Sequence, residues 1–171
     1  SKRLWSLIAD RLQLEREKRF AHMKNTEVSR VNRDTFRVRM DAHDFQGFEQ
    51  QLSDWMESVW TNGSMKVEIE WKKRQDGDNG IFYFEADPSG GGRSLTWLDE
   101  KKITVSHGAY TATLAHELGH VLGFQDQYFE IFEEPRCEYR MRLNDEDVMS
   151  NPFMGSATAE EWLELQRLAP M

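Results

Sequence analysis

Two periodicities of hydrophobic residues run along the chain and predict two kinds of element. Apolar and polar side chains alternate in residues 34–41, 65–71 and 81–85, as they do in strands with one buried face. Residues 102–106 continue this alternation, and residues 94–98 form a shorter segment that would pair as an edge strand. These segments predict a β-sheet that precedes the C-terminal part of the chain.

Helical spacing marks two segments in the N-terminal half. Residues 3–24 place leucine and isoleucine on one face and arginine and glutamate on the other, which predicts an amphipathic helix. Its mixed charge favours packing on the domain, or a connection to a preceding module, over binding to a membrane surface. A second helix is predicted to begin at Asp44 as its N-cap and to end at Gly63, with an aromatic stripe in the core.

Two more helices are predicted in the C-terminal half. The first begins at Thr111 and carries Leu and Val residues at helical spacing. The second covers residues 159–168, because Thr158 and Glu161 form the sequence pattern of a capping box. Helices and strands in this order predict an α+β domain.

The segment between two of the predicted strands, residues 76–80, reads Asp-Gly-Asp-Asn-Gly. These residue types tolerate positive φ, so the segment is predicted to form a turn of the hairpin type. Its carboxylate and amide side chains could alternatively hold calcium, although their spacing is not that of an EF-hand loop.

The residues best suited to bind a metal and transfer a proton lie in the sequence His116-Glu117-Leu118-Gly119-His120. A helix places His116 and His120 on one face, where two imidazoles can bind one zinc ion. Glu117 then lies beside the open coordination position, where a carboxylate can accept a proton from water.

Gly123 and Asp126 extend the motif. Gly123 lets the helix stop, so that Asp126 can turn back as a third ligand and leave the fourth position for water. His107, or Glu160 or Glu161 on the last predicted helix, are alternative third ligands. At this composition the five-residue motif alone arises by chance in about one chain in 70, and the Gly and Asp offsets lower this to roughly one in ten thousand. The pattern therefore favours a catalytic metal site over two packed histidines.

This motif, His-Glu-x-x-His-x-x-Gly-x-x-Asp, resembles that of the metzincin-type zinc metallopeptidases. With Asp as the third ligand and a nearby Tyr, it is closest to the snapalysin-like small bacterial proteases. The matched residues are His116, Glu117, Gly119, His120, Val121, Leu122, Gly123, Asp126 and Tyr128. The resemblance implies a zincin-like α+β fold, in which a twisted mixed sheet packs on an active-site helix and a backing helix. It also implies one catalytic Zn²⁺ and an edge strand that binds extended substrate.

The resemblance further implies a Met-containing turn beneath the metal. Asp147-Val148-Met149-Ser150 resembles that turn, with Met149 as its floor, and Met154 is a second candidate. A tyrosine could stabilise the oxyanion that develops during hydrolysis. Tyr128 fits by position, with Tyr139 and Tyr110 as the other candidates, although Tyr128 could equally pack beside the helix end.

The expected organisation is an N-terminal helix or connector over residues 1–30 and one zincin-like domain over residues 31–171. The cleft would lie between residues 31–123 and 124–171. Within the latter, residues 129–147 form an insertion that could shape the substrate pocket, act as a lid or be a surface loop.

Composition and charge limit the classes of molecule that the chain is expected to bind. The net charge of −8 argues against nucleic acid, and no apolar run approaches the ~20 residues that span a membrane. Cys137 is the single cysteine, so the chain cannot form an internal disulfide, whereas the secreted snapalysin-type enzymes can carry one. Its thiolate could alternatively bind the zinc ion and block the site. No signal peptide is recognisable at the start of the sequence.

The sequence thus predicts a monomeric zinc endopeptidase that acts on protein or peptide substrates. We expect it to be a domain of a larger bacterial exported or delivered protein, such as a toxin or effector, with a cytoplasmic location as the alternative. The competing interpretation is a zincin-like binding module with little or no proteolytic activity. A purely structural zinc site is disfavoured, because no fourth ligand has suitable spacing.

Overall fold

A computed structural model describes residues 25–89, 93–109, 111–133 and 138–169, with side chains at all of these except 111, 129–133 and 138–142. The helix predicted over residues 3–24, Tyr110 and Cys137 therefore lie outside the described residues. The described part is a mixed α+β structure, as the alternation of periodicities predicted.

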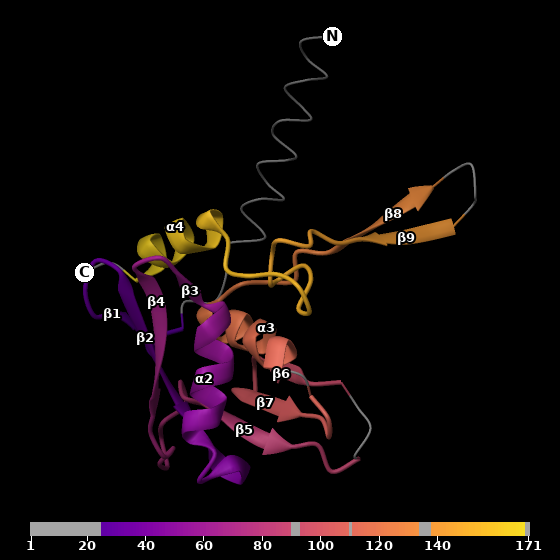
Figure 1. Cartoon of the computed structure of the whole chain (residues 1–171). Helices are drawn as coiled ribbons and strands as arrows, with labels where there is room; N and C mark the ends of the chain where they lie inside the picture. The colour runs from indigo at the N-terminus through magenta and orange to yellow at the C-terminus, as the bar shows by residue number, and fades with distance from the viewer. Residues whose placement is uncertain (1–24, 90–92, 110, 134–137, 170–171) are drawn as a thin grey trace.

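The main sheet is mixed and curled (Figure 1). Its strands are β1 (Val28–Arg30), β2 (Thr35–Asp41), β3 (Thr61–Asn62), β4 (Met65–Trp71), β5 (Phe82–Ala86), β6 (Leu95–Trp97) and β7 (Lys102–Val105). The order is β3-β4-β2-β5-β7-β6, with β1 paired to β2. β4, β2, β5 and β7 run parallel, whereas β1, β3 and β6 are each antiparallel to their neighbour. The predicted strands are confirmed, and β6 lies at the edge as expected.

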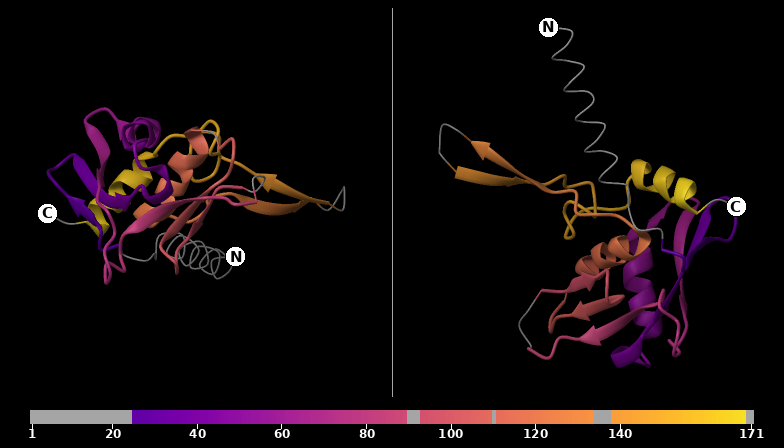
Figure 2. Two further views of the ribbon diagram at one scale, coloured as in Figure 1. Left: turned by 90° about the horizontal axis from the view of Figure 1, so that it is seen from below. Right: turned by 180° about the vertical axis from the view of Figure 1, so that it is seen from behind.

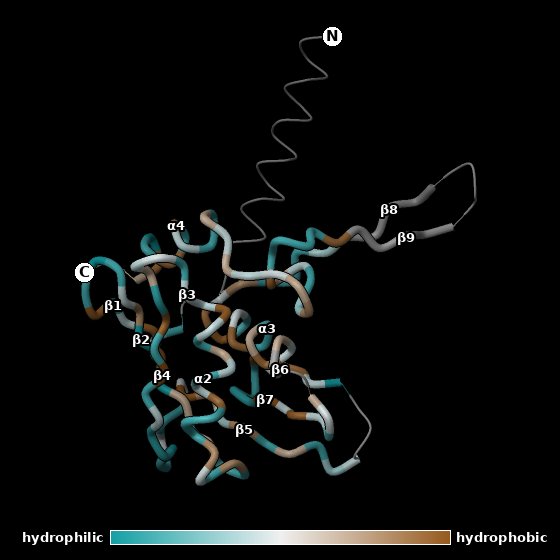
Figure 3. The backbone as a smooth tube through the Cα atoms, viewed as in Figure 1, coloured by the Kyte–Doolittle hydropathy of each residue, from teal (hydrophilic) through white to brown (hydrophobic). Residues whose placement is uncertain are grey.

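The helices α2 (Glu49–Val59) and α3 (Thr111–Leu122) lie against the sheet, and α4 (Ala159–Leu168) covers the end at which β2 and β4 begin and the antiparallel β1 ends (Figure 1). In Figure 3 the brown, hydrophobic segments include much of α3, because this helix is surrounded by other elements.

The core lies between the sheet and the helices. Phe36, Val38 and Met40 of β2 are fully buried beneath them. Trp60, directly after α2, stacks on Phe124 at a centroid distance of 5.6 Å and also contacts Trp162 of α4. Each large apolar side chain buried in this way stabilises the fold by about 1.5–3 kcal/mol. The aromatic stripe predicted for α2 therefore joins α2, α3 and α4.

The start of the second helix differs from the prediction. Asp44 is not its N-cap, because His43–Phe45 form a separate 3₁₀ turn, η1, and α2 begins only at Glu49. Gly47, with a φ of +91°, interrupts the helical backbone between them. The Asp44 carboxylate instead accepts a 3.0 Å hydrogen bond from the backbone N–H of Ala86, which ties η1 to β5.

The end of this helix also differs from the prediction. It stops at Val59, and Gly63 lies in the turn between β3 and β4. At Gly63 the φ of +62° is in the left-handed region, which glycine adopts without steric cost. The glycine therefore turns the chain in a hairpin rather than at the helix end.

The prediction of a hairpin at residues 76–80 is wrong. β4 and β5 do not pair with each other, because both run parallel to β2 and lie on opposite sides of it. The turn is thus part of a crossover around the most buried strand of the sheet. In this turn the Asp78 carboxylate accepts the Gln75 N–H at 3.1 Å and lies 3.6 Å from Lys72 Nζ.

The insertion at residues 129–147 contains a two-stranded antiparallel sheet, β8 (Phe129–Glu133) and β9 (Glu138–Arg142). Figure 2 shows this pair projecting away from the main sheet and the helices in both views. Its backbone is therefore neither a plain loop nor part of the main sheet.

The last predicted helix is confirmed together with its capping box. Thr158 Oγ1 accepts a hydrogen bond from the Glu161 N–H, and Glu161 Oε2 accepts one from the Thr158 N–H. Trp162 and Leu165 form its buried face, and Leu168 is half-buried. Among the described residues, no helix combines the length and the apolar character that crossing a membrane requires.

Candidate metal centre

Helix α3 brings the two motif histidines together. His116 and His120 lie one turn apart and their ring centroids are 4.8 Å from each other, with the ring planes nearly perpendicular. His116 is buried and His120 is half-buried. The helix therefore presents both imidazoles on one side, as the motif predicted.

Each histidine has one ring nitrogen engaged by the backbone. Nδ1 of His116 lies 2.8 Å from the carbonyl oxygen of Val148, and Nδ1 of His120 lies 2.8 Å from that of Phe124. A carbonyl can only accept, so we assign the proton of each neutral ring to Nδ1. Nε2 of each ring is then the nitrogen that can bind a metal, and the ring orientation is held by the second contact.

Asp126 completes the group. Gly123 ends α3 with a φ of +108°, where its N–H bonds to the His120 carbonyl. Beyond this turn, Asp126 Oδ1 lies 3.0 Å from Nε2 of His116 and 3.5 Å from Nε2 of His120. Within the described part of the chain, these three residues form the one group whose ligand atoms converge closely enough for a metal ion.

The electrostatics of this group favour a positive charge. Burial opposes ionisation of Asp126, but His116 and His120, which donate to it from Nε2 when they are protonated, outweigh this effect and hold the pKa of this carboxyl well below its usual range. Burial likewise opposes the charged form of His120, yet Asp126, the Phe124 carbonyl and Glu117 together raise its pKa. An anionic Asp126 beside two imidazoles suits a divalent cation, and two nitrogens with one carboxylate oxygen is a donor set that zinc accepts.

Glu117 lies next to this group and is only 4% exposed. Thr96 Oγ1, from the edge strand β6, donates a 2.6 Å hydrogen bond to Glu117 Oε2. Burial raises the pKa of Glu117, while the bond from Thr96 and the nearby His120 and His116 act in the opposite direction. Thr96 was not among the residues selected from the sequence. The alternation in β6 could have identified it, since Leu95 and Trp97 are exposed and Thr96 is half-buried between them.

Tyr128 contacts the third candidate ligand. Its hydroxyl donates a 2.9 Å hydrogen bond to Asp126 Oδ2, the carboxylate oxygen that does not face the histidines. Burial and the Asp126 carboxylate raise the pKa of Tyr128. Tyr128 thus orients Asp126. The side chain of Tyr139 and the whole of Tyr110 lie outside the described residues.

Met149 lies fully buried against α3. A Cβ atom on Gly119 would overlap Met149 Sδ and approach a ring carbon of Trp60 to 3.0 Å. Trp60 in turn donates a 2.8 Å hydrogen bond from Nε1 to the Ala115 carbonyl. Gly119 is therefore the residue that allows Met149 to approach the helix between the two histidines. Met154 is 72% exposed and does not occupy this position.

The turn that carries Met149 is tightly bonded. Asp147 Oδ1 accepts the Met149 N–H at 2.7 Å, and the Asp147 carbonyl accepts the N–H groups of Ser150 and Asn151. The same turn supplies the Val148 carbonyl that orients His116. It therefore supports the metal group both by packing and by a hydrogen bond.

The alternative third ligands lie elsewhere. His107 is exposed between β7 and α3, and Glu160 is exposed at the start of α4. Glu161 is buried and serves in the capping box. Burial, with the nearby Asp147 carboxylate, raises the pKa of Glu161 to about 8. None of the three belongs to the converging group that Asp126 completes.

Comparisons of this chain with family models, with curated proteins and with solved structures gave no match. Only the residues of the site itself therefore indicate the function of this chain.

Proposed function

We propose that this chain is a zinc-dependent endopeptidase of the metzincin type, closest in motif to the snapalysin-like small bacterial proteases. The observation that carries the proposal is the convergence of His116 Nε2, His120 Nε2 and Asp126 Oδ1 beside the buried carboxylate of Glu117. Three ligands of this kind leave a zinc ion one coordination position for water and substrate, whereas a structural zinc site uses four.

His116, His120 and Asp126 would hold the zinc ion. When bound, the ion would supply Lewis acidity, which polarises a scissile carbonyl and lowers the pKa of water toward neutrality. Glu117 would accept a proton from the attacking water and deliver it to the leaving amine. Burial supports this role, because it raises the pKa of Glu117 and thereby strengthens the carboxylate as a base.

Surrounding residues would position these groups. The Val148 and Phe124 carbonyls orient the two imidazoles, and Tyr128 orients the Asp126 carboxylate. The edge strand β6 pairs with β7 on one side, and on its other side no described strand pairs with it. Such an edge can bind an extended peptide by adding it to the sheet, which would bring a peptide bond close to Glu117.

The decisive experiment measures casein hydrolysis and zinc content together, for the wild type, Glu117→Ala and Glu160→Ala. Glu160 is an exposed glutamate outside the site and serves as the matched control. We expect one zinc per chain in all three proteins, and cleavage by the wild type and Glu160→Ala only. Zinc bound without cleavage by any of them would favour a zincin-like binding module. Zinc bound in none of them would overturn the proposal.

A further inference from the structure

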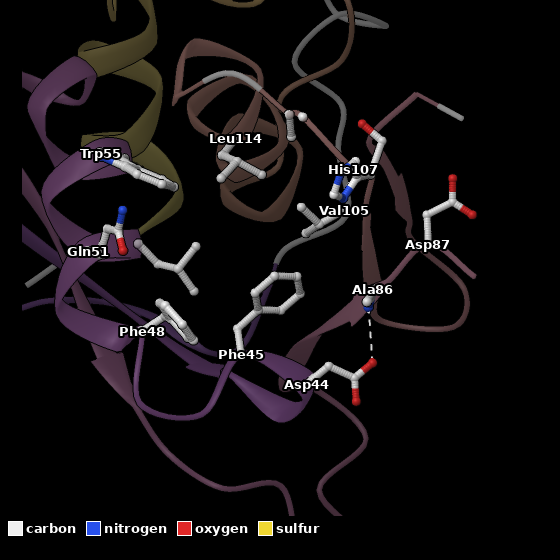
Figure 4. Close-up of a pocket in the computed structure, with 14 residues that line it drawn as sticks. Asp44, Phe45, Phe48, Gln51, Trp55, Ala86, Asp87, Val105, His107 and Leu114 are labelled. Atoms are coloured by element: carbon white, nitrogen blue, oxygen red, sulfur yellow. Dashed lines mark hydrogen bonds between the residues drawn. The ribbon is translucent and has the colours of Figure 1, made fainter. Parts of the chain in front are cut away.

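A cavity lies between α2 and the ends of β5 and β7, away from the candidate metal ligands. It has a volume of about 480 Å³ and is bordered by η1, α2, the ends of β5 and β7, and the first turn of α3 (Figure 4). None of His116, Glu117, His120 or Asp126 lines it. We call it the α2–β7 pocket, and its volume falls within the range of small-molecule sites.

One part of the α2–β7 pocket is apolar and rich in aromatic side chains. Phe45, Phe48 and Trp55 form one wall, and Leu114 of α3 points into the space from above (Figure 4). Phe48 is 57% exposed, and Phe45 and Trp55 are only partly buried. Covering this exposed aromatic surface with an apolar ligand would remove it from water, which contributes favourably to the free energy of binding.

The opposite part of the pocket is polar and acidic. Asp44 and Asp87 lie on the side formed by the end of β5, with His107 above them (Figure 4). Asp44 Oδ2 accepts the Ala86 N–H at 3.0 Å, and its Oδ1 lies 3.0 Å from Nδ1 of His43. Asp87 accepts the N–H and hydroxyl of Ser89 at 2.9 and 2.7 Å. These contacts orient both carboxylates, and among the described residues no lysine or arginine lines the pocket. The pocket therefore presents negative charge beside an aromatic wall.

We propose that the α2–β7 pocket binds a small amphiphilic cation, with an aromatic or branched aliphatic body and a protonated amine. The body would pack between Phe45, Phe48 and Leu114. The amine would lie on the side of the pocket that holds Asp44 and Asp87, where the two carboxylates supply negative charge. A cation near an aromatic face gains additional attraction, whereas an anion of the same shape would be repelled by both carboxylates.

The test compares two ligands of nearly equal shape and opposite charge. Tryptamine and indole-3-propionate both carry an indole and a two-carbon chain, and they end in an ammonium and a carboxylate. Binding to the whole chain is measured by calorimetry and by the chemical shifts of the Gly108 and Ala109 amides, which border the pocket. We expect tryptamine to bind roughly tenfold more tightly than indole-3-propionate, a ratio that falls as salt is added.

Variants locate the binding. Ala86 is exposed and lines the pocket, so Ala86→Phe should fill it and abolish binding, while Ala86→Ser should leave binding unchanged. The double variant Asp44→Asn/Asp87→Asn should lower the preference for tryptamine at least about threefold. Asp54→Asn is the control, because Asp54 is exposed on α2 and does not line the pocket. It also removes one negative charge, and the preference for tryptamine should stay unchanged.

Three outcomes would each overturn the assignment. These are no binding of tryptamine, equal or tighter binding of indole-3-propionate, and tryptamine binding that survives Ala86→Phe. Circular dichroism and thermal unfolding check that each variant is folded. The readouts do not involve zinc or proteolysis, so the result is independent of the proposed endopeptidase.

Discussion

The hydroxyl of Thr96 lies 2.6 Å from Oε2 of Glu117 and donates a hydrogen bond to it. This bond joins the edge strand β6 to the carboxylate that is the proposed general base. The two residues are 21 positions apart in sequence. A peptide added to β6 would thus be aligned by the same strand that orients Glu117.

Thr96→Val should lower kcat by about tenfold, because the isosteric side chain cannot donate to Glu117, and loss of such supporting contacts typically costs 10–100-fold. Zinc content and KM should change little, because Thr96 contacts neither histidine nor Asp126 in the described interactions. Steady-state kinetics on a peptide substrate measure this. Thr96→Ser keeps the donor and should retain most of the activity, and an equally inactive Ser variant would contradict the role.

Gly119→Ala should destabilise the fold by about 1–3 kcal/mol, although alanine normally favours a helix over glycine. The added methyl group would overlap Met149 Sδ and crowd Trp60. Urea unfolding measures the change. In a Met149→Ala background only the 3.0 Å approach to Trp60 remains, so Gly119→Ala should there cost much less than in the wild type. Additive effects of the two substitutions would rule out the contact as the cause.

Zinc should raise the melting temperature of the wild type by roughly 5–10 °C at about 100 times its Kd, because a ligand that binds only the folded state stabilises it. Chelation should reverse the shift. Asp126→Ala should lose most of this response, since it removes one of the three converging ligand atoms. Asp145→Ala, an exposed acidic residue outside the group, is the control, and scanning calorimetry with and without zinc provides the measurement.

Stability should also depend on pH through Glu161. Its pKa is about 8 in the folded chain, above the ordinary value of 4.5, so the folded state binds this proton more tightly than the unfolded state. The resulting stabilisation is complete below about pH 4.5 and is lost as the pH rises through about 8. Glu161→Gln keeps an oxygen that can accept the Thr158 N–H but has no titrating proton. The free energy of unfolding of the variant, relative to the wild type, should therefore rise by about 4 kcal/mol between pH 5 and 9. A difference that stays constant over this range would contradict the assignment.

Several features could be predicted because they depend on residues close together in sequence. The spacing of His116 and His120 determines that one helix face carries both rings, and Gly123 allows the chain to turn back toward Asp126. The capping box of Thr158 and Glu161 is likewise contained within four residues. Strand alternation identified β2, β4, β5, β6 and β7 for the same reason. A local conformational preference is already present in a short segment of chain.

Other features required the tertiary structure. The sequence does not indicate that β2 separates β4 from β5, because strand order depends on which edges meet during packing. Asp44 contacts β5 instead of capping α2, and Thr96 reaches Glu117, only because the sheet brings distant segments together. The Val148 carbonyl orients His116 across 32 positions of sequence. The sequence by itself therefore determined the candidate ligands and the elements that carry them. The tertiary structure decided how those ligands are oriented, because hydrogen bonds and close packing between distant residues form only in the folded chain.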